Sequence, residues 1–201
     1  ITISNVNMAG TITDSSPSSG SYAQATINGR VGSNVTAVIE NSTGSSMTVS
    51  GPLTVNSNGT ILANHNPSGA SLLTLSGSIS GTGNLILSNN SAIANGIALS
   101  GATVNNSGAI TNSGTGTGNT VISAVIGTGV SRVVQNSPSS MLTLSGANPY
   151  TGGLFIKAGT VRASHINAGG TNSSIITLGD TAGSADATLL GEWLSERKGK
   201  K

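Results

Sequence analysis

The sequence predicts an all-β fold, a parallel β-solenoid of about eight coils with roughly 19–26 residues in each coil. Three observations predict it. A short phrase recurs at that period, apolar residues alternate with hydroxyl residues between glycine corners, and strong helix formers are nearly absent before residue 192. The length of 201 residues fits one domain, or one segment of a longer repetitive chain.

The recurring phrase runs apolar, Thr or Ala, apolar, Ser, Gly. Clear copies lie at residues 47–51, 73–77, 97–101 and 142–146. A related copy at 25–29 extends the series backwards, and a weaker copy at 124–127 divides the one long gap. Self-similarity at such a period is typical of solenoids, in which each repeat forms one coil.

The alternation within each period indicates strands. Leu73, Leu75 and Ile79 point one way while Thr74 and Ser76 point the other, and Leu85 and Leu87 repeat the apolar spacing after the Gly-Thr-Gly corner at 81–83. We expect two or three short strands per period, each pairing in parallel with the same strand of the next coil at about 4.8 Å. A narrow column of stacked Val, Ile, Leu and Ala then forms the core, which explains why only 2% of the residues are aromatic.

The composition excludes several other classes. The chain has no cysteine, so a disulfide-stapled module and a cysteine zinc site are excluded. Ser, Thr, Asn and Gly make up just over half of the residues, which leaves a low-complexity spacer as one alternative. A β-sandwich is another. The regular apolar pairs argue against the spacer, and the scarcity of aromatic residues argues against the sandwich.

Charge is scarce and unevenly placed. Only 7% of residues are charged, and residues 1–191 carry four acids and four bases. The net charge of +2 therefore arises in the last ten residues. Nucleic-acid binding proteins present basic grooves with interleaved aromatic residues, and the neutral body shows no such run. We therefore predict no nucleic-acid partner.

The most specific stretch is MLTLSGANPYTGGLFIKAGTVRA at residues 141–163. It resembles the passenger-associated transport repeat, also called the autotransporter-associated β-strand repeat. The positions that we assign to the repeat motif are Leu142, Leu144, Ser145, Gly146, Tyr150, Gly152, Gly153 and Gly159. The stretch departs from the family at Pro149, where a small polar residue is usual, and at 154–155, where two threonines are common. Residues 176–191 also resemble segments between such repeats.

This resemblance implies an exported protein, extracellular or at the bacterial cell surface, whose passenger is a right-handed parallel β-helix. Passengers of this type are carried outward by a membrane translocator barrel, which we expect outside this chain. Two regions follow from the pattern: a solenoid over residues 1–191 and a charged tail over 192–201. The tail has three open explanations: a polar cap with Trp193 and Leu194 over the last coil, a truncated or out-of-frame end, or a remnant of cloning.

The sequence contains few candidate catalytic residues. Glycoside cleavage commonly uses two carboxylates about 5–10 Å apart, and the nearest pair is Asp180 and Asp186 in a Gly/Ser loop. Aspartates in such loops commonly stabilise turns. His65 and His165 lie about four coils apart, on the order of 20 Å, too far to share one metal ion. We expect no catalytic residues, cofactor or metal.

Two classes of function remain. The first is a non-enzymatic structural or adhesive surface protein, a rod-like passenger segment or filament subunit that presents Ser, Thr and Asn to glycans or surfaces. Self-association through the solenoid ends belongs to this class, because the strand-like start Ile1-Thr2-Ile3 offers an edge for pairing. The alternative is a β-helix carbohydrate-active enzyme, a polysaccharide lyase or hydrolase. Carboxylates or lysines clustered on one face would favour it.

Overall fold

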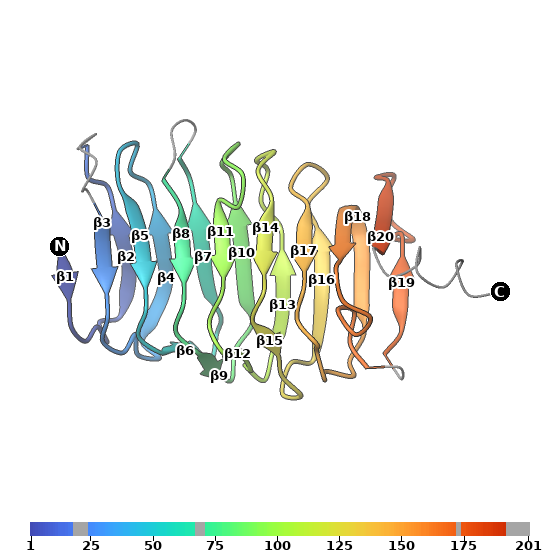
Figure 1. Ribbon diagram of the computed structural model, residues 1–201, viewed down its shortest axis with the longest axis horizontal. Helices are drawn as coiled ribbons and strands as arrows, with labels where there is room; N and C mark the ends of the chain where they lie inside the picture. Colours follow the sequence, from blue (N-terminus) through green and yellow to red (C-terminus); the bar gives the residue numbers. More distant parts are fainter. Residues whose placement is uncertain (18–23, 67–70, 172–173, 192–201) are drawn as a thin grey trace.

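The computed structural model describes residues 1–17, 24–66, 71–171 and 174–191. Over these residues the chain forms twenty β-strands, with every strand pair parallel, and no helix that could cross a membrane. The strands stack into a β-solenoid whose axis runs from the N-terminal to the C-terminal end (Figure 1). The predicted fold class is therefore confirmed. The tail expected at 192–201 lies outside the described residues.

Each regular coil contributes one strand to each of three faces, which we call sheets A, B and C. Sheet A contains β1 (Thr2–Ile3), β3 (Gln24–Ile27), β5 (Ser46–Val49), β8 (Leu73–Leu75), β11 (Ile97–Leu99), β14 (Thr120–Ile122), β17 (Leu142–Leu144) and β20 (Ala187–Gly191). Sheet B contains β6 (Leu53–Val55), β9 (Ile79–Gly81), β12 (Thr103–Val104) and β15 (Val125–Ile126). Sheet C contains β2 (Gly10–Asp14), β4 (Val35–Glu40), β7 (Thr60–Asn64), β10 (Leu85–Asn89), β13 (Ala109–Asn112), β16 (Arg132–Asn136) and β19 (Ile176–Leu178). The long strand β18 (Leu154–Ala163) belongs to sheets A and C together.

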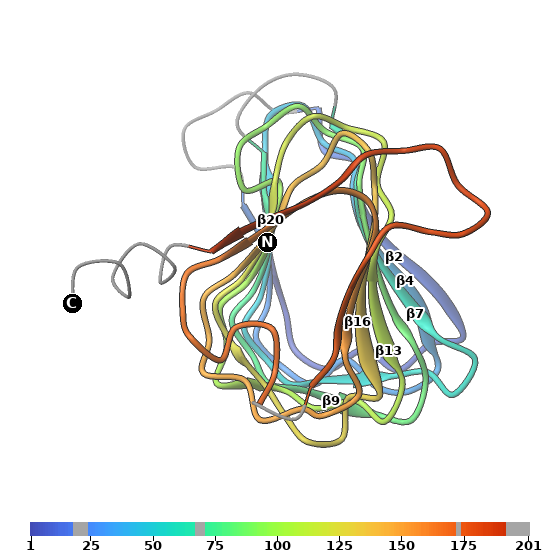
Figure 2. The same ribbon diagram turned by 90° about the vertical axis from the view of Figure 1, so that its right-hand side faces the viewer.

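The solenoid is right-handed. In the view from the C-terminal end, the chain descends through sheet A, crosses sheet B and rises through sheet C, moving counterclockwise as the coils approach the viewer (Figure 2). The stack has about seven turns, close to the eight predicted. The register partners Thr26, Thr48 and Thr74 are 22 and 26 residues apart, as the repeat phrase predicts. Seven steps of about 4.8 Å give a column on the order of 35 Å long.

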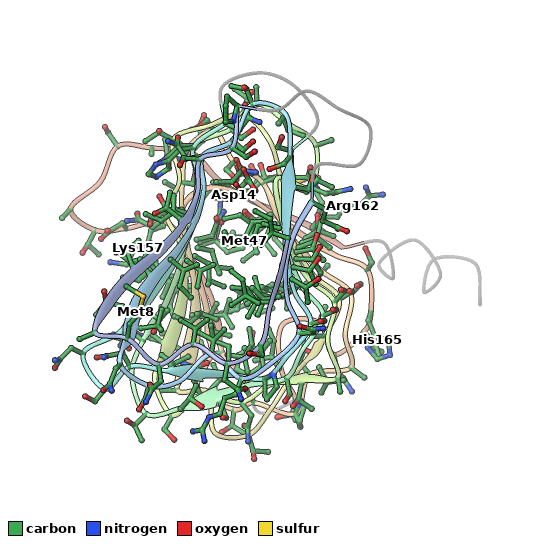
Figure 3. The ribbon with its side chains drawn as sticks, turned by 90° about the vertical axis from the view of Figure 1, so that its left-hand side faces the viewer. Met8, Asp14, Met47, Lys157, Arg162 and His165 are labelled. Carbon is green, nitrogen blue, oxygen red and sulfur yellow. The ribbon has the colours of Figure 1, made fainter. Side chains whose placement is uncertain are left out.

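One continuous apolar cluster fills the interior. In β8, β11 and β17 the first and third residues are buried and the middle one is half-buried, so the period-two pattern directs Leu, Ile and Val inward. Met47 lies between sheets A and C in the view along the axis (Figure 3). Each fully buried aliphatic side chain stabilises the fold by about 2 kcal/mol, so a core with few aromatic residues suffices.

The corners that follow sheet A stack along one line. Its members are Gly29, Gly51, Gly77, Gly101, Ala124 and Gly146. A Cβ on Gly77 would overlap the carbonyl oxygen of Gly51, and the same relation links Gly51 to Gly29. The close approach of successive corners therefore explains the glycine that ends each phrase.

The weaker copy of the phrase was placed wrongly at 124–127. The sheet A strand of that coil is β14, and Val125 and Ile126 instead form β15 of sheet B. The corner of this coil is Ala124, whose N–H donates to the carbonyl of Leu99 at 3.1 Å. The true copy of the phrase is at 120–124, and it ends in alanine instead of glycine. Gly127, which follows β15 at the next corner, was mistaken for the glycine that ends the phrase.

A column of buried polar side chains runs along the C-terminal ends of the sheet C strands. Its members are Asp14, Glu40, Asn64, Asn89, Asn112 and Gln135. In the first four coils the side-chain oxygen accepts the N–H two residues onward, which starts the turn back to sheet A. Asn64 also donates its Nδ2 to the carbonyls of Ser71 and Gly96 at 3.0 and 2.7 Å. Amides therefore satisfy backbone groups inside a nearly uncharged fold.

The coil that contains β18 has no turn between sheets C and A. The first half of β18 pairs with β16 and the second half pairs with β17. Gly159 bends the strand at φ +77°, and a Cβ there would overlap the carbonyl oxygen of Ser137. This direct corner shortens the coil to the 19 residues that separate Thr143 from Arg162.

A candidate binding groove on the outer face of sheet C

An open groove of about 610 Å³ lies on the outer face of sheet C. Its walls and floor come from four neighbouring strands, β10, β13, β16 and β18. The residues that line it are Asn84, Ile86, Ala109, Thr111, Ser113, Arg132, Val134, Asn136, Phe155 and Lys157. These residues lie 20 or more residues apart from strand to strand, so the groove exists only because the coils are stacked in register.

The groove is hollow because β13 carries small outward side chains. Thr111 is paired with Ile86 on one side and Val134 on the other, and the register continues to Phe155. Ala109 lies on the same strand as Thr111, and Ser113 directly follows that strand. These small groups lie between the larger Ile86 of β10 and Val134 of β16, and the half-buried Phe155 follows on the next coil.

Two cations stand at the groove. Arg132 is exposed at the start of β16, and Lys157 projects from a bulge in β18, where Asn136 pairs with Ala158 and leaves Lys157 as the extra residue. Lys157 Nζ lies 3.3 Å from Asp180 Oδ2. The Ala182 N–H, and after it Lys157, hold the pKa of Asp180 below its usual range. The loop that carries Asp180 follows β19 and projects outward beside sheet C (Figure 2).

None of the residues assigned to the repeat motif lines the groove. Leu142, Leu144 and Tyr150 are buried in the core cluster, and Ser145 is exposed at the end of β17. Gly146 occupies the corner line described above. A Cβ on Gly152 would overlap the carbonyl oxygen of Ser131, Gly153 has φ +94°, and Gly159 forms the bend in β18. The structure places seven of the eight positions in the packing and corners of the stack, and Ser145 on its surface.

Asn148 is a structural residue that the motif assignment omitted. Its Oδ1 accepts the N–H of Ile126 at 2.9 Å, and its Nδ2 donates to the carbonyl of Ala168 at 2.7 Å. One buried amide therefore joins three successive coils. The asparagine stands in the phrase at 141–163, but its position alone does not show that the side chain points along the axis.

The scattered acids and histidines do not converge. Both oxygens of Asp180 are occupied, by Lys157 and by the Ala182 N–H, whereas Asp186 is exposed and its backbone carbonyl accepts the Gly159 N–H. His65 is exposed, and His165 is half-buried and accepts the Asn167 N–H through Nδ1. Over the described ranges, no three His, Cys, Asp or Glu side chains group as a metal site would need.

Comparison with known families adds one finding. The model of the passenger-associated-transport-repeat matches residues 139–163, the segment that contains β17 and β18. The chain therefore carries an autotransporter passenger repeat there, as the resemblance of residues 141–163 predicted. No curated protein and no solved structure matches the chain.

Proposed function

We propose that this chain is a rod segment of an exported, autotransporter-type passenger, and that its role outside the cell is structural or adhesive rather than enzymatic. One observation carries the proposal. The passenger repeat at 139–163 is not a separate module, because β17 and β18 continue the register of the preceding coils. The repeat is therefore one part of a single continuous stack.

The outer face of sheet A supports a role in display. An exposed row of hydroxyl and amide residues runs along the axis, with one residue directly after each sheet A strand. Its members are Asn28, Ser50, Ser76, Ser100, Ser123, Ser145 and Ser164. Beside it, Thr26, Thr48 and Thr74 stack in register. A flat, uncharged surface of this kind offers many hydrogen-bonding groups to glycans or to other surfaces.

Surface labelling tests the export of this rod. In cells that produce the complete gene product, an antibody raised against residues 24–191 is expected to label intact cells or to detect the protein in the medium. A cytoplasmic protein serves as the control for cell integrity. Labelling that requires permeabilised cells, with none in the medium, would contradict the proposal.

End-to-end association is a second part of the proposal. Among the described strands, β1 and β2 at the N-terminal end and β19 and β20 at the C-terminal end each pair with one neighbour only. Each of these strands therefore has a free edge that a parallel strand could extend. Sedimentation velocity over a range of concentrations tests this. A sedimentation coefficient that rises with concentration, with short rods lengthening in negative-stain images, is expected. A constant monomer at every concentration would reject association through the ends.

The carbohydrate-active enzyme is the competing function. Its support is weak because the groove-lining residues include no carboxylate, while the hydrolysis of glycosides uses two. A panel of neutral and acidic polysaccharides distinguishes the two functions. We expect no shorter or unsaturated products. Turnover that is lost in Asp180→Asn would establish the enzyme instead.

A further inference from the structure

We propose that the groove on sheet C binds an acidic saccharide chain along the solenoid axis, with Arg132 as its anion contact and Phe155 as its ring contact. The inference rests on the proposed adhesive function and names a ligand class for it. The groove is the candidate because it combines a largely apolar floor, amide donors and a cation in one hollow.

The floor runs along the axis rather than along a strand. Ile86, Thr111, Val134 and Phe155 are successive register partners, one from each coil. Three steps of about 4.8 Å span roughly 14 Å, which accommodates a short oligosaccharide. The C–H face of a sugar ring packs on apolar and aromatic groups, and the half-buried Phe155 ring offers such a surface at one end.

The charge at the groove selects an anion. Among the described residues, the Lys157–Asp180 contact is the ion pair, and it leaves the exposed Arg132 without a carboxylate beside it. A guanidinium binds a carboxylate through two parallel hydrogen bonds. The groove therefore carries one uncompensated positive charge, which suits a ligand with a carboxylate, such as a uronate.

The amides add polar contacts suited to sugar hydroxyls. Asn84 accepts the Ala109 N–H through Oδ1 at 2.9 Å, which fixes the side chain and leaves Nδ2 as a donor at the rim. Asn136 lies on the other side, at the end of β16. A few fixed polar groups around an apolar floor are typical of sites for small ligands. An acidic peptide could also pair a carboxylate with Arg132, but it has no sugar ring to pack on the floor.

The test is calorimetric titration of residues 1–201 with oligosaccharides of matched length. Oligogalacturonate supplies carboxylates, a heparin fragment supplies sulfates, a maltooligosaccharide is neutral, and oligoglutamate is the acidic peptide. We expect either acidic saccharide to bind, and to bind more tightly than the neutral sugar and the peptide. The tighter of the two acidic saccharides identifies the anion.

Matched variants assign the binding to the groove. Arg132→Gln is expected to weaken binding about tenfold or more, because a charged hydrogen-bonding partner is lost. Arg162→Gln removes the same charge from the opposite side, since Arg162 lies on sheet A while Lys157 marks sheet C (Figure 3). It is expected to leave affinity nearly unchanged. Phe155→Leu is expected to weaken the acidic saccharides while the far-ultraviolet circular dichroism stays that of the parent.

Several results would overturn the inference. Among them are the absence of binding to any acidic saccharide, an equal loss of affinity in Arg132→Gln and Arg162→Gln, and oligoglutamate binding as tight as that of oligogalacturonate. The surface labelling described above is independent of these titrations. A rod that is exported but binds no saccharide refutes the groove alone, whereas binding by a protein that stays inside the cell refutes the proposed location.

Discussion

Glu40 occupies a position in the polar column where the next coils carry asparagine. Glu40 is paired with Asn64, and both side chains are fully buried. Its Oε1 accepts the Ser42 N–H, while Oε2 has no hydrogen-bond partner. Burial raises the pKa of Glu40 to about 7, the Ser42 N–H opposes the rise, and the nearby Asp14 adds to it. A protonated Glu40 resembles the amides of the column, because one oxygen accepts and the other can donate.

The first prediction concerns this carboxyl. The folded pKa of about 7 lies above the ordinary value of 4.5, so the folded state binds the proton more tightly. The contribution of Glu40 to stability is then greatest below pH 4.5 and falls, by on the order of 3 kcal/mol, as the pH rises to about 7. Glu40→Gln is expected to remove this fall and to be more stable than the parent at pH 8. Urea unfolding across this pH range measures it.

The control for Glu40 is Asp186→Asn, which removes an exposed carboxylate. It is expected to keep the fall in stability of the parent. If Glu40→Gln also keeps that fall, the pH dependence arises elsewhere and Glu40 is ionised in the folded state at neutral pH.

The second prediction concerns Tyr150, which is fully buried and whose hydroxyl has no partner. Burial raises the pKa of Tyr150 far above its usual range. Tyr150→Phe removes an unsatisfied polar atom and keeps the ring, so we expect stability to be unchanged or to rise by about 1 kcal/mol. Tyr150→Ala is expected to cost about 3–5 kcal/mol through the cavity it leaves. Thermal unfolding distinguishes them, and a clear loss in Tyr150→Phe would show that the hydroxyl has a partner.

At the scale of the coil, the corner line determines how closely successive turns approach. A Cβ on Gly77 would overlap a backbone carbonyl, and backbone cannot move aside as a side chain can. We predict that Gly77→Ala lowers the free energy of unfolding by about 1–3 kcal/mol. Gly183→Ala is the matched control, because a Cβ there meets only ordinary contacts, and it is expected to change stability by less than about 0.5 kcal/mol. Equal effects would show that the corners do not restrict packing.

The bridging amide of Asn148 gives the fourth prediction. Asn148→Ala leaves the Ile126 N–H and the Ala168 carbonyl without their partner, at a cost of about 2 kcal/mol or more. Asn148→Asp keeps an acceptor for Ile126 but removes the donor for Ala168, and it is expected to be destabilised as well. Hydrogen exchange should quicken at Ile126 in the alanine variant. Unchanged exchange there would show that the bridge does not form.

The coil is also the scale at which the sequence was informative. Alternation and the terminal glycine predicted the sheet A strands at 47–51, 73–77, 97–101 and 142–146, because each position there has one strong physical requirement. The copy of the phrase in the coil of β14 was assigned to the wrong residues, because its corner carries Ala124 instead of the glycine that marks the other corners. The direct passage of β18 through Gly159 was also missed, since an Ala-Gly-Thr segment fits one strand or two.

The groove and the polar column could not be predicted from the sequence. Each joins residues from successive coils, and the number of residues between coils varies from 19 to 26 in the register of sheet A up to Arg162. An error of one residue reverses which side of the strand a side chain faces. Arg132 and Phe155 can be placed on one outer face only when the register of β16 and β18 is known.

For the whole molecule, a nearly neutral body and an in-register stack have the same cause. Equivalent positions on neighbouring coils lie about 4.8 Å apart, so a repeated charge would repel its own copies. Ser, Thr and Asn carry no charge and can hydrogen-bond along the axis, as Asn95 and Asn119 do at 2.7 Å. A stack of equivalent coils is therefore most stable when its repeated surface positions carry uncharged polar residues, as they do in this chain.

The central claim is that the coils stack in register at a constant rise, and electron-spin distance measurements test it most directly. The chain has no cysteine, so spin labels at Ser50→Cys and Ser145→Cys are unique. Four coil steps separate these exposed sites along sheet A, which predicts a narrow distribution near 19 Å. Moving the second label to Ser164→Cys should add about one step of 4.8 Å. A broad distribution, or a mean that does not lengthen with that move, would contradict the solenoid.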